Sequence, residues 1–397
     1  MLILADGLLQ APDHVLRPGR LRISGRFIQQ TGTDLTPQPG EEILELPGIT
    51  LAPGFLNLHA HLELTPLHQK IPAGLPFAEW LRQILQLLPG LHATARTASI
   101  LGSSRTAAET GTTTILSILS DPCALAGLAG TLPRVWWAME FMDLHGDPQP
   151  ARQMDKMAAW LSRHPGCAWR AAISPHAPYS ASTDLYRECA RLATALHLPL
   201  TTHWAESIEE EEFFRSGQGN LRKLLPESWD PGRLSDRLET IPAGSLLAHA
   251  NRLDDGSLSE LGKRGCFVVH CPTSHRWFQR DPFPWEKFRQ HGIPVILGTD
   301  SPASSDNPAL DLRAEIRAFR SSHPSISLKE IWNMVTVLPA RALGHEGRLG
   351  CLGPGAAADW VGWRLPAGAD PISSILESGG AAEILSVAGR IYQPEQI

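Results

Sequence analysis

The chain has 397 residues, which allows two or three domains or one barrel with an accessory domain. Hydrophobic residues make up 43% and charged residues 19%, as in ordinary globular enzymes, and a net charge of −6 gives no attraction to nucleic-acid phosphates or anionic lipid. The N-terminus lacks a signal-peptide pattern, and no apolar run reaches the roughly eighteen residues of a membrane span. The six cysteines include no CxxC pair. We therefore expect a cytoplasmic protein with reduced thiols that binds neither nucleic acid nor membrane.

Short β-type segments separated by glycines occur near both ends of the chain. Their ranges are 1–4, 20–24, 42–46, 359–363, 384–387 and 390–392. Neither end could bury a core alone. We therefore predict that residues 1–51 and 346–397 together form one small β-sandwich domain.

The middle of the chain, residues 52–345, alternates short apolar segments with helical ones. Strands are expected at residues 54–58, 112–118, 134–138, 170–173, 198–202, 245–248, 266–269 and 294–297. Helices are expected at residues 78–88, 94–110, 183–197, 257–264 and 285–290. Eight strands separated by helices predict a fold of the α/β class, a (β/α)₈ TIM barrel. The alternative is a doubly wound open sheet, but the glycine-rich phosphate turn expected after its first strand is missing.

Side chains able to bind metal or move protons directly follow most of these strands. In chain order they are His59, His61, His176, His203, Glu206, His249, His270 and Asp300. Active sites of such barrels lie at the C-terminal ends of the strands, so these side chains are expected to converge. Residues two apart in a strand point the same way, so His59 and His61 can share one metal ion.

Each of these residues alone has an ordinary structural explanation. A single histidine at a strand end is more often structural than catalytic, and the acidic run 209–212 is better explained as a solvated helix face. Only the coincidence of the whole set favours a metal-dependent active site.

The segment 53–61, PGFLNLHAH, resembles the opening metal motif of the amidohydrolase superfamily. Later motifs of its cytosine deaminase, adenosylhomocysteine deaminase and chlorohydrolase branch are matched as well, and the resemblance extends over essentially the whole chain. The matching segments are LPFAEWL at 75–81, HWAES at 203–207, AHAN at 248–251, LGTDS at 297–301, PARALG at 339–344 and LGPGAAAD at 352–359.

The resemblance implies that His59, His61, His203 and Asp300 bind a divalent metal ion. Three neutral imidazoles and a carboxylate suit zinc, with iron as the alternative, and leave a position for water. Two-metal members of the superfamily bridge their ions with a carboxylated lysine at the end of the fourth strand. The segment 169–176 contains no lysine, so one metal ion is expected.

The same resemblance implies a catalytic scheme for a deaminase. The metal lowers the pKa of water from 15.7 towards about 7, and Asp300 also accepts the proton of that water. His249 orients the hydroxide, and Glu206 protonates the ring nitrogen beside the attacked carbon. A tetrahedral intermediate then releases ammonia and leaves a keto product.

Two further residues are candidates for substrate contacts. His176 resembles the substrate-binding histidine of the adenosine-type deaminases, and its alternative role is structural. Glu63 lies close enough to the metal motif to bond a substrate hydroxyl or amine; otherwise it forms a salt bridge at the rim. The acidic residue with which adenosylhomocysteine deaminases hold the ribose is missing from residues 71–74, which leaves Glu63 for that contact.

The segment 269–278, VHCPTSHRWF, resembles a subgroup often associated with aminodeoxyfutalosine deamination in menaquinone synthesis. That substrate is an adenosine carrying a benzoate, so Arg276 is a candidate partner for the carboxylate; the alternative is an exposed loop arginine. We therefore expect aminodeoxyfutalosine or a related 6-aminopurine nucleoside as substrate, followed by a free base such as cytosine or guanine.

The ligand motifs leave other functions open. A hydrolase of s-triazines or halogenated heterocycles would use the same metal site with a different leaving group. A catalytically silent barrel scaffold would lack ligands, and none is missing. The expected partner is a small heterocyclic substrate, and a homodimer is the default expectation for a cytosolic enzyme.

Overall fold

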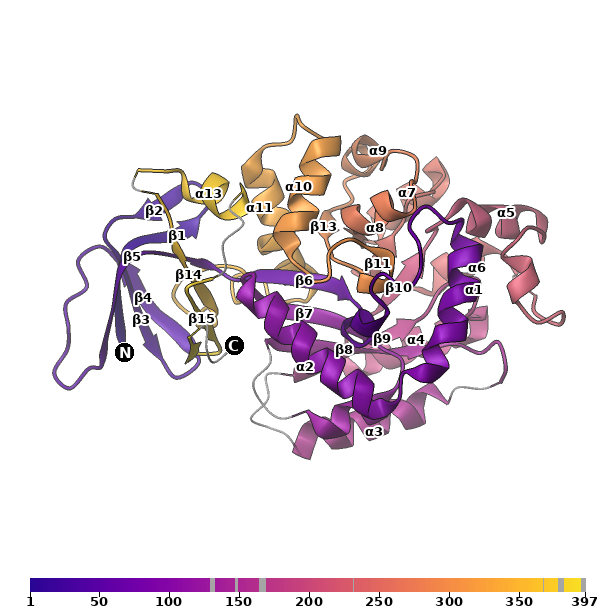
Figure 1. Cartoon of the computed structure of the whole chain (residues 1–397), viewed down its shortest axis with the longest axis horizontal. Helices are drawn as coiled ribbons and strands as arrows, with labels where there is room; N and C mark the ends of the chain where they lie inside the picture. The colour runs from indigo at the N-terminus through magenta and orange to yellow at the C-terminus, as the bar shows by residue number, and fades with distance from the viewer. Residues whose placement is uncertain are drawn as a thin grey trace.

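The computed structural model describes residues 1–128, 133–146, 149–163, 169–230, 232–366, 368–377 and 382–393. It contains a barrel of parallel strands with a sheet built from both ends of the chain beside it (Figure 1). In this view the sheet lies at the left, and β6 and β7 of the barrel point away from it towards α1.

Eight parallel strands form the barrel, at the places where the apolar segments predict them. They are β6 (Phe55–Ala60), β7 (Thr112–Leu119), β8 (Arg134–Phe141), β9 (Trp169–Pro175), β10 (Thr201–Trp204), β11 (Leu246–His249), β12 (Phe267–His270) and β13 (Val295–Leu297). The first four pair in chain order, and so do the last four.

Short backbone contacts join these two halves into a ring. Ile173 of β9 forms a parallel bridge with Leu200, just before β10. At the other seam Ala60 forms a parallel bridge with Asp300, whose amide donates to the carbonyl oxygen of His59 at 3.0 Å. The predicted (β/α)₈ fold is confirmed, and its closure brings two predicted ligands together.

Alternate strand residues pack into one apolar cluster, as expected for the inward face of a barrel. Leu56 and Leu58 of β6 belong to it with Leu116 and Ile118 of β7 and residues of β8, β9, β11, β12 and β13. Three residues of the segment 340–349 also belong to the cluster. The intervening residues pack against the surrounding helices.

Helices cover the strands. The α-helices are α1 (Phe77–Leu87), α2 (Ala93–Glu109), α3 (Pro150–Arg163), α4 (Thr183–Leu196), α5 (Ile208–Ser216), α6 (Leu234–Thr240), α7 (Asp255–Lys263), α8 (Pro272–Trp277), α9 (Trp285–Gln290), α10 (Leu312–Ser322), α11 (Leu328–Val335), α12 (Val337–Ala342) and α13 (Pro371–Glu377). The five predicted helices correspond to α1, α2, α4, α7 and α9. Within the described residues, no helix combines the length and apolarity that crossing a bilayer requires.

The strands from both termini pair in one sheet. They are β1 (Leu2–Ala11), β2 (His14–Leu16), β3 (Gly19–Ser24), β4 (Phe27–Gly32), β5 (Ile43–Pro53), β14 (Trp360–Arg364), β15 (Ile384–Val387) and β16 (Arg390–Tyr392). The order is β16-β15-β14-β5-β1-β3-β4, with β2 on β1. The amide of Ile28 in β4 donates to the carbonyl oxygen of Ala356 at 2.8 Å, so the edge strand returns to the segment before β14. The two layers of the expected sandwich therefore belong to one continuous sheet.

A buried ion pair ties this sheet to the barrel. Arg134, the first residue of β8, donates to both carboxylate oxygens of Asp359 at 3.0 and 3.1 Å, and the amide of Ala388 donates to the same carboxylate at 2.6 Å. Removing one partner of such a pair leaves the other charge buried and unpaired.

Asp359→Ala is therefore expected to lower the free energy of unfolding by about 3–5 kcal/mol. Denaturant unfolding measures this loss. The matched control is Glu346→Ala, which breaks the exposed pair with Arg341 and is expected to lower it by less than about 1 kcal/mol. Equal losses in the two variants would contradict a structural role for the buried pair.

Candidate metal centre and active site

The predicted ligands His59 and Asp300 lie at the ends of the neighbouring strands β6 and β13. Asn57 donates through Nδ2 to Oγ1 of Thr299 at 2.7 Å, which ties the two strands together. Gly298 permits their close approach, because a Cβ there would lie 3.1 Å from Cβ of His59 and 2.8 Å from Cγ1 of Val269. The register of β6 on β7 also shifts between Asn57 and Ala60, next to the first histidine.

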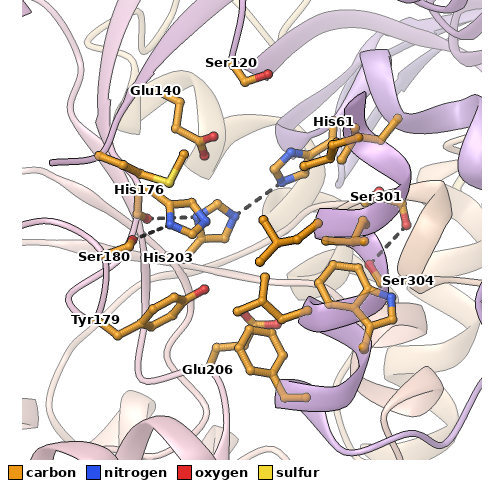
Figure 2. A pocket seen from close by; sticks show the side chains of 18 of the residues that line it. His61, Ser120, Glu140, His176, Tyr179, Ser180, His203, Glu206, Ser301 and Ser304 are labelled. Carbon is orange, nitrogen blue, oxygen red and sulfur yellow. Dashed lines mark hydrogen bonds between the residues drawn. The ribbon is translucent and has the colours of Figure 1, made fainter. Parts of the chain in front are cut away.

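The four predicted ligands converge. Nε2 of His61 lies 3.3 Å from Nε2 of His203 (Figure 2), and Oδ1 of Asp300 lies 3.5 Å from Nε2 of both His59 and His61. In the described part of the chain, neither ring nitrogen of the buried His59 has a hydrogen-bond partner. Unpartnered buried nitrogens beside a carboxylate fit a divalent cation as their common partner.

The surroundings of His61 and His203 leave a ring nitrogen of each available to bind a metal ion. Burial, followed by the charges of its neighbours, keeps the pKa of His61 well below its ordinary value, so this imidazole is neutral. Nδ1 of His203 donates to the carbonyl oxygen of His176 at 2.9 Å, which leaves its Nε2 as a lone-pair donor.

The carboxylate of Asp300 is held from its other side. Its Oδ2 accepts hydrogen bonds from Oγ of Ser274 at 2.6 Å and of Ser304 at 3.1 Å, so Oδ1 faces the histidines. Burial raises the pKa of Asp300, but the approach of the His59 ring to Oδ1 and the electrostatic effect of the neighbouring histidines outweigh it and set the pKa well below its ordinary value. Neutral imidazoles and an ionised carboxylate form a donor set that suits zinc or iron.

Glu206 and His249 lie beside this cluster. Oε1 of the buried Glu206 is 3.7 Å from Nε2 of His249 and accepts a hydrogen bond from Arg280 at 2.6 Å. The Glu206 amide donates to Glu210 of α5 at 2.8 Å, and its carbonyl oxygen accepts from Asn251 at 2.9 Å. Helix α5 and the segment after β11 therefore hold the carboxyl group in place.

The backbone is strained where the strands end. His249 has φ 68°, Asp300 has φ 56° and Ala205, just before Glu206, has φ 46°. Non-glycine residues in this left-handed region each cost about 1–3 kcal/mol, and such residues gather at functional sites. Their clustering supports a functional role for these strand ends.

His61, His203 and Asp300 line a pocket that also contains two of the predicted substrate contacts, His176 (Figure 2) and Glu63. Nδ1 of His176 is 2.5 Å from Oγ of Ser180. Oε1 of Glu63 accepts hydrogen bonds from Ser120 and forms an ion pair with Arg96 at 3.0 Å, while its Oε2 has no partner among the described residues. Both residues line the pocket, and one oxygen of Glu63 is left for a ligand.

Glu140 is a pocket residue that sequence reasoning missed. It lies near the end of β8, two residues beyond the strand expected from the sequence, and no motif marks it. Its carboxyl group lies beside His176 and His203 (Figure 2), its Oε1 has no partner in the described part of the chain, and burial raises its pKa to about 7.

The structure does not bring His270 and Arg276 into this pocket. His270 stacks on Phe283, with ring centroids 3.7 Å apart. Arg276 lies on α8, its side chain is 59% exposed, and it pairs with Asp306 at 2.8 Å. Residues two apart in a helix point about 200° apart. Because Ser274 faces Asp300, Arg276 points to the surface, and the structure does not support it as a substrate contact.

Arg276→Ala is accordingly expected to change kcat/KM by no more than about fivefold, the scale of an exposed ion pair. Steady-state kinetics on nucleosides with and without a carboxylate test this expectation. A tenfold or larger rise in KM confined to the carboxylate-bearing substrate would instead place Arg276 at the site.

A barrel with this donor set at the C-terminal edge of its strands is typical of metal-dependent hydrolases. The chain belongs to the amidohydrolase family, whose model matches residues 50–388, and the predicted superfamily resemblance is confirmed.

Similar proteins carry deaminase names. The 5-methylthioadenosine/S-adenosylhomocysteine deaminase of Syntrophobacter fumaroxidans is 29% identical over 336 residues, covering 80% of this chain and 73% of that protein. The aminodeoxyfutalosine deaminase of Deinococcus radiodurans is 28% identical over 366 residues, covering 82% and 81%. The crystal structure of Helicobacter pylori aminofutalosine deaminase in complex with methylthio-coformycin has a TM-score of 0.85 over 98% of this chain and 99% of that one. At 21% identity, this last likeness shows the shared fold.

Proposed function

We propose that the protein is a metal-dependent hydrolytic deaminase of 6-aminopurine nucleosides, with one bound zinc ion. The observation that carries this proposal is the gathering of His59 with His61 and Asp300 in one group and with His203 and His249 in another that overlaps it. Glu206 lies beside them, 3.7 Å from His249. The deaminase names of the relatives support the purine nucleoside substrate. The homodimer, the cytoplasmic location and the terminal domain boundaries stay predictions.

The side chains have separate tasks in the reaction. A divalent metal bound by the four ligands would supply hydroxide at neutral pH by lowering the pKa of water. The carboxylate of Asp300 would also accept the proton of the attacking water, and Ser274 and Ser304, which donate to Oδ2, would hold it in place. Glu206 donates a proton to the ring nitrogen beside the attacked carbon, and His249 orients the attacking group. Water and the amine thus become a keto product and ammonia.

A screen of ammonia release tests the substrate class. Adenosine, 5′-substituted adenosines, cytosine, guanine and amino- or chloro-s-triazines would be offered to the metal-loaded enzyme, with halide release followed for the last group. We expect the 6-aminopurine nucleosides to give the highest kcat/KM. Turnover confined to triazines or free bases would overturn the proposal, and no turnover of any compound would favour a silent scaffold.

A further inference from the structure

A buried ion pair joins Glu206 to an arginine outside the catalytic pocket. Nη2 of Arg280 donates to Oε1 of Glu206 at 2.6 Å, and the two side chains are 10% and 7% exposed. The guanidinium also lies over the ring of Phe278, 4.4 Å from its centroid. Glu206 lines the catalytic pocket, whereas Arg280 does not. Any effect of Arg280 on the reaction is therefore expected to pass through Glu206.

Arg280 has little to do besides bonding Glu206. Within the described residues, its side chain makes no other hydrogen bond, and its buried Nη1 has no partner. An arginine that stabilises a loop differs: Arg222 donates to three consecutive backbone carbonyl oxygens, those of residues 225–227. A buried donor without a partner is costly to the fold. The position of Arg280 is therefore better explained by the carboxylate it holds than by a gain in stability.

The carboxyl group of Glu206 has no other hydrogen bond from a side chain in the described part of the chain. The contacts with Glu210 and Asn251 fix its backbone amide and carbonyl groups. Nε2 of His249 lies 3.7 Å from the same Oε1, beyond hydrogen-bond distance. The rotation of the carboxyl group is therefore set by Arg280. With Oε1 bonded to Arg280, Oε2 stays available for a ring nitrogen of the substrate.

We propose that Arg280 is a positioning residue of the reaction: its guanidinium holds Oε1 of Glu206 and thereby directs Oε2 to the substrate nitrogen that is protonated. The inference rests on the proposed function and adds the group that orients its proton-transferring carboxyl. Proton transfer requires heavy atoms about 2.6–3.2 Å apart. A displacement of about 1 Å can lower a rate roughly a hundredfold, so a carboxyl group free to rotate would transfer the proton slowly.

Arg280→Met tests the proposal, because methionine keeps an apolar stem against Phe278 and removes the donors. We expect kcat to fall by about 10- to 100-fold. The KM for the nucleoside should stay within about threefold of wild type, since Arg280 does not line the pocket. The matched control is Arg252→Met: Arg252 borders the same neighbouring cavity as Arg280 but pairs with Glu211 and Asp281. Its kcat should stay within about twofold of wild type.

A double-mutant cycle separates positioning from a structural role. In Glu206→Gln the side chain no longer transfers a proton, so its orientation does not affect the rate. Arg280→Met should therefore lower the remaining kcat of Glu206→Gln by no more than about twofold. Metal content and thermal unfolding are measured on every variant. If Arg280→Met unfolds, Arg280→Lys replaces it in the cycle: lysine keeps the charge without the planar fork, and should lower kcat by at least about threefold only where Glu206 is present.

The possible failures are distinguishable. An unchanged kcat in folded, metal-loaded Arg280→Met would overturn the positioning role while deamination by the wild-type enzyme still supports the proposed function. An equal fall in kcat in the wild-type and Glu206→Gln backgrounds would overturn it as well, because Arg280 would then act independently of Glu206. No ammonia from adenosine or 5′-substituted adenosines with the wild-type enzyme would overturn the proposed function and this inference with it.

Discussion

Replacing Glu206 by glutamine is expected to lower kcat by about 10²- to 10⁴-fold, the loss typical of a missing general acid-base group. Glutamine has the same size, and its amide oxygen can still accept the hydrogen bond that Arg280 donates to Oε1. The backbone contacts with Glu210 and Asn251 do not involve the side chain that changes. The variant should therefore keep its fold and its metal, and lose only the proton transfer that the carboxyl group performs.

Three measurements on Glu206→Gln separate these effects: kcat by ammonia release, metal content by elemental analysis and thermal unfolding. The matched control is Glu211→Gln on helix α5, which begins two residues after Glu206. Its exposed carboxylate pairs with Arg252, and its kcat should stay within about twofold of wild type. Near-normal turnover by Glu206→Gln would show that another group moves the proton.

Replacing His59 or His61 by alanine is expected to remove metal and activity together. Each substitution deletes one of the four ligands, and His59 is buried with no other partner for its ring nitrogens among the described residues. Removing a ligand lowers metal affinity directly, and without the metal no group in the pocket can supply hydroxide at neutral pH. His14→Ala, at an exposed histidine of β2 in the terminal sheet, is the control and should retain both.

Metal content and kcat of the purified variants check this expectation. Retention of a full equivalent of metal in both His59→Ala and His61→Ala would show that the ion binds elsewhere. Loss of metal with unchanged ammonia release would show that the reaction does not need it.

The sequence predicts the centre of this site because two patterns coincide. Apolar runs mark the barrel strands, and His59, His203 and Asp300 lie at or just after the ends of three of them. Barrel closure then brings these strand ends together, so their convergence follows from topology. The pairing of β4 with the segment before β14 involves residues more than 300 positions apart, and no local pattern encodes it.

The walls of the pocket depend on side-chain direction, which the pattern does not determine. Glu140 lies near the end of the apolar strand β8, and no sequence motif identifies it as a pocket residue. Arg276 and Arg280 are four residues apart in one segment, yet the first faces solvent and the second reaches Glu206. Arg276 lies within α8 (Pro272–Trp277), and the helix turn directs its side chain to solvent. Arg280 follows the end of this helix, so its direction depends on the loop there.

The most direct test of a one-metal deaminase is a zinc titration of the metal-free protein, with ammonia release from a 6-aminopurine nucleoside measured after each addition. The proposed ligands His59, His61, His203 and Asp300, and the absence of a lysine in the segment 169–176, predict that activity rises linearly and saturates at one equivalent of zinc per chain. Activity that appears only with the second equivalent, or that is already full before any zinc is added, would contradict this account.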